Sequence, residues 1–186
     1  MRLFLVVLMT VFPFFSYGND FKTEEILDHL NRKVNHPLPS VEIMDLAISG
    51  YELLKSEEQI SNRRNIITVI DFSLSSVAKR LWVIDLDSSN VLFYSHVAHG
   101  KNTGEDMAMH FSNVVNSNKS SLGFYVTGDK YIGKHGLSLR LHGAEKGIND
   151  NAFSRAIVMH GADYVSNDFI NQYGRLGRSF GCPAVS

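Results

Sequence analysis

The sequence contains a single cysteine, Cys182, among its 186 residues. One thiol cannot form a disulfide within the chain, so a disulfide-stabilised scaffold is excluded. An unpaired cysteine is commonly buried as a small apolar side chain, and otherwise serves as a reactive thiolate. Both interpretations of Cys182 stay open until the residues around it are considered.

The sequence also lacks an excess of positive charge. Eighteen Lys and Arg residues are set against 19 Asp and Glu residues, which gives a formal net charge of -1. Proteins that hold a phosphate backbone usually carry a basic surplus. Nucleic acid is therefore not expected as a partner.

Long hydrophobic runs are absent except at the start of the chain. Arg2 precedes an almost wholly apolar run, Leu3–Phe15, and small residues follow at Ser16 and Gly18. A positive start, a short apolar region and small residues at the end are typical of a secretory signal peptide, here residues 1–18. The apolar region is too short for a spanning helix, although an uncleaved membrane anchor is the alternative. We expect cleavage near Gly18 and an exported protein.

Residues 19–65 have a helical pattern. A charged helix is predicted from Phe21 towards Val34, and His36–Pro39 should end it because proline removes a backbone donor. Ser40 is a good N-cap for a second helix through about Lys55, whose apolar residues recur at steps of three and four. This N-terminal helical segment is expected to pack on the main domain.

From residue 66 onwards the pattern changes to that of strands. β-Branched and alternating segments are predicted as strands over residues 66–71, 81–86, 91–97, 123–128 and 137–142, and a helix over 163–173. The fold class expected is mainly β with flanking helices, a sandwich or barrel-like sheet. Residues 66–186 should form one domain.

The last part of the chain holds the main chemical candidates. A buried strand, Ala156–Met159, is predicted to end at His160, and Cys182 lies between a glycine and a proline. A cysteine nucleophile needs a base beside it and backbone donors for an oxyanion, which the amides around Gly181 could supply. Arg178 would add a positive field or bind a substrate carboxylate. The sequence thus predicts a Cys182–His160 pair.

Six of the eight histidines fall between residues 96 and 160, and five of them raise the question of zinc: His96, His99, His135, His142 and His160. Their spacing matches neither the metalloprotease helix nor a structural Cys–His site, so zinc is not favoured. Hydrogen-bonded rings at strand ends explain His96 and His110 better. Arg140, Arg155 and Arg175 could contact a carboxylate, but surface or strand-edge positions are the simpler interpretation.

The tail segments AIVMHGADYV and GRLGRSFGCPAV resemble the signature of the murein L,D-transpeptidase catalytic domain family (YkuD-type L,D-transpeptidases). Upstream segments such as RLWVIDL, VAHGKNTG and GKHGLSLRLHG fit the same family. The resemblance covers roughly residues 66–186.

The resemblance implies an enzyme of cell-wall biogenesis and cell shape. Cys182 would attack the carbonyl before the terminal D-Ala of a peptidoglycan stem tetrapeptide, and His160 would accept the thiol proton. An amine of a second stem would then resolve the thioester into a 3→3 cross-link. The enzyme would work in the periplasm or cell wall, peripheral to the wall, without a metal, an organic cofactor or an obligate protein partner.

The resemblance also assigns supporting residues. Ser179, Gly181 and Gly161 map onto loop-shaping and oxyanion-hole positions. The candidates for substrate binding are Arg178, His99, Arg140 and His142.

Two features depart from the family pattern. Many members have a polar residue before the Gly-Cys pair and Arg or Asn soon after it, where this chain has Phe180, Pro183 and Ala184. Family domains also usually continue with one or two more strands, whereas this sequence ends at Ser186, so either the C-terminal end is truncated or the final sheet is incomplete. The first feature concerns the substrate contacts, and the second concerns the sheet beside Cys182.

Two other functions fit the same residues. Water could resolve the thioester, which would make the protein an L,D-carboxypeptidase or a peptidoglycan hydrolase. Alternatively, a buried Cys182 would leave a non-catalytic wall-binding protein.

Overall fold

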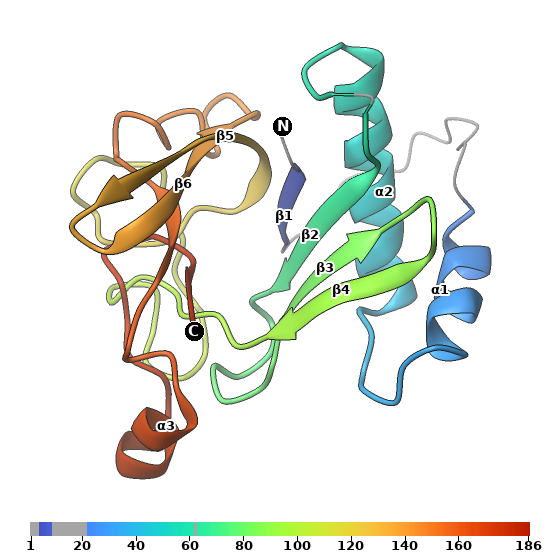
Figure 1. Ribbon diagram of the computed structural model, residues 1–186. Helices are drawn as coiled ribbons and strands as arrows, with labels where there is room; N and C mark the ends of the chain where they lie inside the picture. The colour runs from blue at the N-terminus through green and yellow to red at the C-terminus, as the bar shows by residue number, and fades with distance from the viewer. Residues whose placement is uncertain (1–3, 9–21, 62) are drawn as a thin grey trace.

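A single mixed sheet forms the framework in the computed structural model, which describes residues 4–8, 22–61 and 63–186 (Figure 1). The strands within these residues are β1 (Phe4–Leu8), β2 (Ile66–Asp71), β3 (Leu81–Asp85), β4 (Asn90–Ser95), β5 (Gly123–Gly133), β6 (Gly136–Gly143), β7 (Val158–Gly161) and β8 (Ala184–Val185). Their order in the sheet is β4-β3-β2-β1-β5-β6-β7-β8. The pairs β1–β2 and β7–β8 are parallel, and the other described pairs are antiparallel. The predicted fold class, mainly β with flanking helices, is confirmed.

Two helices cover one end of the sheet: α1 (Thr23–Asn31) and α2 (Val41–Ser56). The predicted cap is present, since the Ser40 side chain accepts a hydrogen bond from the Ile43 amide at 3.4 Å. The apolar face of α2, including Met44 and Tyr51, packs with Trp82 into the first hydrophobic cluster. In Figure 1 both helices lie on the side of the molecule that holds β2, β3 and β4. The N-terminal helices thus stabilise the half of the sheet that is remote from Cys182.

A second hydrophobic cluster joins residues of β2 and β3 to residues of β5, β6 and the segment before β7. Its buried members include Phe72, Tyr125, Leu141 and Ile157, and the partly buried Cys182 packs against it. Burial of such side chains contributes about 1.5–3 kcal/mol each relative to exposure. The last short helix, α3 (Asn167–Tyr173), begins at its N-cap Ser166 and connects β7 to the segment that carries Cys182.

Strand β7 is displaced by two residues from its predicted start. Ala156 was expected to begin the strand, but its φ of 54° lies in the left-handed region, where an extended strand cannot continue. The Ala156 amide instead closes a turn by donating to the Phe153 carbonyl at 3.0 Å. The strand therefore begins at Val158, and His160 lies inside it rather than beyond its end.

Strand β1 lies within the predicted signal peptide. Its backbone pairs in parallel with β2 and antiparallel with β5, so it joins the two halves of the sheet (Figure 1). The predicted cleavage position at Gly18 lies outside the described residues. None of the helices in the described part of the chain is long and apolar enough to cross a membrane.

A substitution at Gly50 tests how closely α2 packs on the sheet. Replacing an interior helical glycine by alanine normally adds about 1 kcal/mol of stability. Here an added Cβ would lie 2.3 Å from the Phe124 ring, so we expect Gly50→Ala to lower the free energy of unfolding by about 1 kcal/mol or more. Urea denaturation measures the difference.

The neighbouring exposed residue provides the control. Ser49→Ala changes the same helix without meeting the sheet, and it should leave stability unchanged or slightly raised. Stabilisation by both substitutions to a similar degree would contradict the close packing of Gly50 on Phe124.

Candidate active site

The pairing of β7 with β8 places the two predicted catalytic residues on adjacent segments of the chain. His160 lies opposite Ala184, and Gly161 opposite Val185, in a parallel register. Cys182 precedes β8 by two residues and therefore enters the sheet beside Val158. Residues 22 positions apart in sequence thus lie on adjacent segments.

Ser179 holds the backbone of the Cys182 loop. Its hydroxyl donates to the Cys182 carbonyl at 2.6 Å and accepts from the Gly181 amide at 3.0 Å. Its own amide donates to the His99 carbonyl at 3.0 Å. These bonds close a tight turn directly before β8.

Gly181 occupies a conformation that few other residues adopt. Its φ is 124°, and an added Cβ would lie 2.8 Å from the Lys119 carbonyl oxygen. Because its amide already donates to Ser179, Gly181 has no free donor for an oxyanion in this conformation. The Cys182 amide has no hydrogen-bond partner among the described residues and is the better-placed donor. Gly161 is exposed, and space above its Cα is open.

The Cys182 thiol is mostly buried. Its sulfur accepts from the Val158 amide at 3.5 Å and lies 3.8 Å from the Ala156 carbonyl, to which it donates. Burial raises the pKa of the thiol, whereas the Val158 amide, Arg155 and Lys134 act to lower it. The resting thiol is therefore protonated near neutral pH and needs a base.

His160 is buried and has a defined tautomer. Its Nδ1 lies 2.8 Å from the Gly161 carbonyl oxygen, which can only accept, so Nδ1 carries the proton. Nε2 is then left with the lone pair that a general base requires. The sulfur's hydrogen-bond partners in the described chain do not include this ring, and such bonds often form only when substrate binds.

His135 covers one face of the His160 ring. The two rings are stacked with centroids 4.3 Å apart and planes inclined by 19°. His135 lies in the turn between β5 and β6, and partial burial, followed by the proximity of His160, lowers its pKa. The stack restricts the orientation of His160, a contact between segments that sequence spacing alone could not predict.

His99, predicted to bind substrate, lies in the interior. Arg80 Nη2 donates to its Nδ1 at 2.9 Å, and its Nε2 donates to the Gly104 carbonyl at 3.2 Å. Burial, with a smaller effect from Arg80, lowers the pKa of His99 to about 4. Both ring nitrogens are thus engaged, and the geometry favours a structural role.

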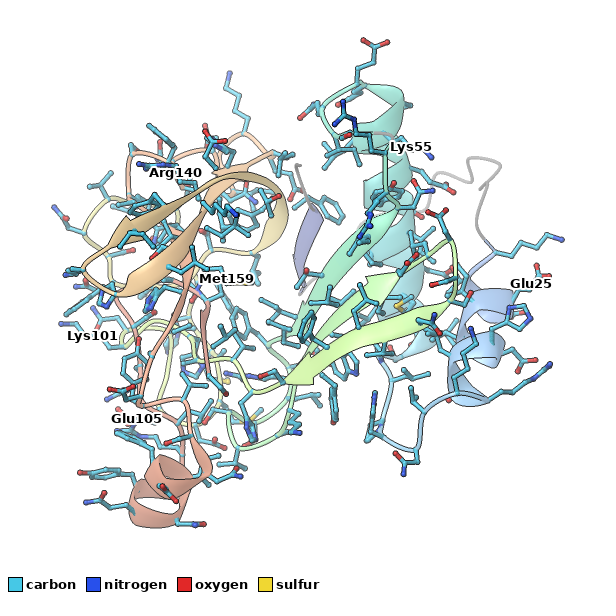
Figure 2. The ribbon with its side chains drawn as sticks, in the orientation of Figure 1. Glu25, Lys55, Lys101, Glu105, Arg140 and Met159 are labelled. Atoms are coloured by element: carbon cyan, nitrogen blue, oxygen red, sulfur yellow. The ribbon has the colours of Figure 1, made fainter. Side chains whose placement is uncertain are left out.

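The described contacts of the other three predicted substrate-binding residues are to groups other than the sulfur. Arg178 donates to Glu105 Oε1 at 2.6 Å and to the Gly104 carbonyl at 3.1 Å, so it braces a neighbouring loop. Arg140 stacks over the Tyr131 ring at 4.5 Å, in the half of the molecule formed by β5 and β6 (Figure 2). His142, on the same strand as Arg140, stacks on Phe153.

Arg80 is the residue that the sequence pattern did not single out. It is fully buried, and it donates to the Val97 carbonyl at 3.0 Å and to the Leu74 carbonyl at 2.6 Å as well as to His99. Burial lowers its pKa to about 10. An arginine directly before the apolar run Leu81–Ile84 was the one available signal.

Metal binding has no candidate cluster in the described residues, since no group of three His, Cys, Asp or Glu side chains is placed to hold an ion. Below the Cys182 loop lies a small cavity of about 10 Å³, lined in part by Ser120, Ser121, Tyr125 and Gly181. A volume of this size holds at most one water molecule.

A family model described as the L,D-transpeptidase catalytic domain matches residues 36–186, most of the chain. The match includes His160, Ser179 and Cys182 together with the second helix of the N-terminal segment. No curated protein and no solved structure shows a significant similarity to the chain.

Removal of the Ser179 hydroxyl should loosen the Cys182 loop. Ser179→Ala loses two hydrogen bonds and leaves the Gly181 amide without its acceptor, so we expect a loss of about 2 kcal/mol in the free energy of unfolding. Denaturant titration gives the value. Ser154→Ala, which removes an exposed hydroxyl, should change stability by less than about 0.5 kcal/mol. Equal losses of stability in Ser179→Ala and Ser154→Ala would contradict the role of the Ser179 hydroxyl in holding the Cys182 loop.

Burial of neutral His99 predicts a specific pH dependence of stability. The folded pKa of about 4 lies below the ordinary value of 6.5, so below pH 6.5 the unfolded chain takes up a proton that the folded chain does not. Stability should fall between pH 6.5 and 4, by on the order of 3 kcal/mol from this residue. In His99→Gln the slope of stability against pH should flatten over that range. His110→Gln, at an exposed position, should keep the wild-type slope, and an unchanged slope in His99→Gln would count against the buried neutral ring.

Proposed function

Because the chain belongs to the L,D-transpeptidase catalytic domain family, we propose that it is an exported cysteine L,D-transpeptidase that forms 3→3 cross-links in peptidoglycan. Family membership supports the general L,D-transpeptidase function and implies a peptidoglycan substrate. The proposal adds the nucleophile, the stem tetrapeptide as donor and the compartment. The signal-peptide pattern of residues 1–18 supports export to the periplasm or cell wall.

The observation that carries the proposal is the position of Cys182 beside β7. Its sulfur accepts a hydrogen bond from the amide of Val158, which lies two residues before His160 on the same strand. Ser179 fixes the backbone of the cysteine loop, and the Gly161 carbonyl fixes the His160 tautomer. A sulfur, a base with a free Nε2 and an unpaired amide at Cys182 are the groups that acyl transfer requires.

In the first half-reaction, His160 Nε2 takes the Cys182 proton, and the thiolate attacks the carbonyl carbon between the third stem residue and D-Ala. The carbon–sulfur bond forms, the oxygen becomes negative next to the Cys182 amide, and collapse of this intermediate breaks the carbon–nitrogen bond. His160 returns its proton to the departing amine. The products are free D-Ala and a thioester on Cys182.

In the second half-reaction, the side-chain amine of another stem attacks the thioester. His160 accepts a proton from this amine, the new amide bond forms and the carbon–sulfur bond breaks. The thiolate leaves and regains the proton from His160, so the enzyme returns to its starting state. Water in place of the amine would give the carboxypeptidase outcome by the same steps.

Intact-mass spectrometry tests the proposal directly. Wild-type protein incubated with a carbapenem should gain the mass of one inhibitor, because the thiolate opens the β-lactam and stays acylated. Cys182→Ala should gain none, and His160→Gln should acylate roughly 10²–10⁴-fold more slowly. Ser154→Ala, at an exposed turn, should behave as wild type.

Product analysis then separates the outcomes. With disaccharide tetrapeptide as donor and acceptor, wild-type protein should release D-Ala and form 3→3 dimers. Release of D-Ala without dimers would assign hydrolysis instead. The absence of both an adduct and products from folded wild-type protein would reject the enzyme and favour a wall-binding role.

A further inference from the structure

We propose that Arg155 is a positioning residue for Cys182, whose guanidinium supports the cysteine loop and provides the positive charge that stabilises the thiolate. The inference rests on the proposed function, because it concerns the same sulfur. Sequence reasoning assigned Arg155 to the surface or a strand edge, whereas the structure places it below the loop.

Arg155 is held in one place by neutral acceptors. Its Nη1 donates to the Ser112 carbonyl at 2.8 Å and to Ser121 Oγ at 2.9 Å. Its Nη2 donates to the Lys119 carbonyl and, at 3.4 Å, to Ser117 Oγ. The guanidinium therefore ties the segment 112–121 to the turn that precedes β7, and its position is fixed by a fork of hydrogen bonds.

These contacts leave the positive charge without a counter-ion. The ion pairs formed among the described residues involve Arg32, Arg175 and Arg178, and none involves Arg155. Arg155 is half-buried, and burial lowers its pKa, while the nearby Tyr125 and Cys182 act to raise it. Both of these groups are neutral when protonated. A thiolate on Cys182 would supply the negative charge that the site lacks.

The guanidinium also lies against the cysteine loop. A Cβ atom added to Gly181 would lie 3.3 Å from Arg155 Nη2, and Gly181 directly precedes Cys182. On the other side, the Cys182 sulfur lies 3.8 Å from the carbonyl of Ala156, the residue after Arg155. The Arg155 guanidinium is thus close to Gly181, and its backbone neighbour Ala156 contacts the Cys182 sulfur.

Other ionisable groups around the sulfur are less suited to this role. Lys134 and His135 come from the exposed β5–β6 turn, His160 from β7, and Tyr164 from the segment after β7. Lys134 also lowers the pKa of the thiol, but its effect is smaller than that of Arg155. Charges on exposed side chains are screened by water and salt, whereas a half-buried guanidinium is screened much less.

The charge would act in both half-reactions. It stabilises the thiolate that attacks the substrate carbonyl, and later the thiolate that leaves when the amine resolves the thioester. Between these steps the sulfur is a neutral thioester and the Arg155 charge is again uncompensated. The Arg155 charge therefore stabilises the Cys182 thiolate more than the thioester in both half-reactions.

The thiol pKa can be measured without any substrate. The rate of iodoacetamide labelling of Cys182 against pH has its midpoint at the thiol pKa, because only the thiolate reacts. In Arg155→Gln we expect the midpoint to rise by about one pH unit, which lowers labelling at neutral pH by roughly tenfold. Arg155→Lys should give a smaller rise, because one ammonium group keeps the charge but cannot replace the fork.

A control variant and a folding check separate an effect of the Arg155 charge from a general loss of structure. Arg32→Gln removes an exposed guanidinium paired with Asp28 and should leave the midpoint unchanged. Circular dichroism and thermal unfolding identify folded variants, and if Arg155→Gln does not fold, Arg155→Lys carries the test. A wild-type labelling midpoint in either folded variant would overturn the role of Arg155. Because labelling needs no peptidoglycan, failure of the transpeptidase proposal would appear separately, as missing carbapenem adduct in the wild type.

Discussion

The site depends on one backbone constraint, the pairing of the segment Val97–Lys101 with the residues on either side of Cys182. Ala98 exchanges two hydrogen bonds with Ala184, at 2.8 and 3.3 Å. The carbonyl of His99 accepts from the Ser179 amide, and the Lys101 amide donates to the Ser179 carbonyl. Strand β8 has two residues and would not be stable alone, so its position beside β7 relies on this second partner. Without this pairing, the position of Cys182 relative to His160 would not be fixed.

Arg80 anchors that pairing to the core. It holds the Val97 carbonyl and the His99 ring from inside the molecule and lies 5.0 Å from the centre of the Phe72 ring. Gly100 permits the close approach, because a Cβ there would lie 2.6 Å from the Asn118 carbonyl oxygen and 2.9 Å from Gly181 Cα. A chain of contacts thus runs from a buried arginine through residues 97–100 to the cysteine loop. Burying an arginine costs free energy unless its N–H donors are hydrogen-bonded. Here the hydrogen bonds to backbone carbonyls offset that cost and also hold these carbonyls in place.

Local features of the fold could be predicted from sequence, and long-range ones could not. The Ser40 cap and the strand Ile66–Asp71 follow from neighbouring residues, and both are present. The early start expected for β7 was wrong because Ala156 adopts a positive φ, which its side chain does not require. At the site, the residue pattern named Cys182 and His160, and the resemblance added Ser179. The structure places the three on adjacent segments. Arg155, Arg80 and His135 act through partners more than fifteen residues away, and no local pattern distinguishes them from surface charges.

The location of β1 links the proposed export signal to the structure of the sheet. Phe4–Leu8 lies between β2 and β5, which are not paired with each other. The proposed processing near Gly18 would remove this strand and leave two facing rows of unpaired amides and carbonyls, one on β2 and one on β5, while α2 would still pack on Phe124 of β5. Exposed rows of this kind attract any extended polypeptide of suitable length. In the proposed exported form, the edges of β2 and β5 would therefore be open to pairing with another extended stretch of backbone.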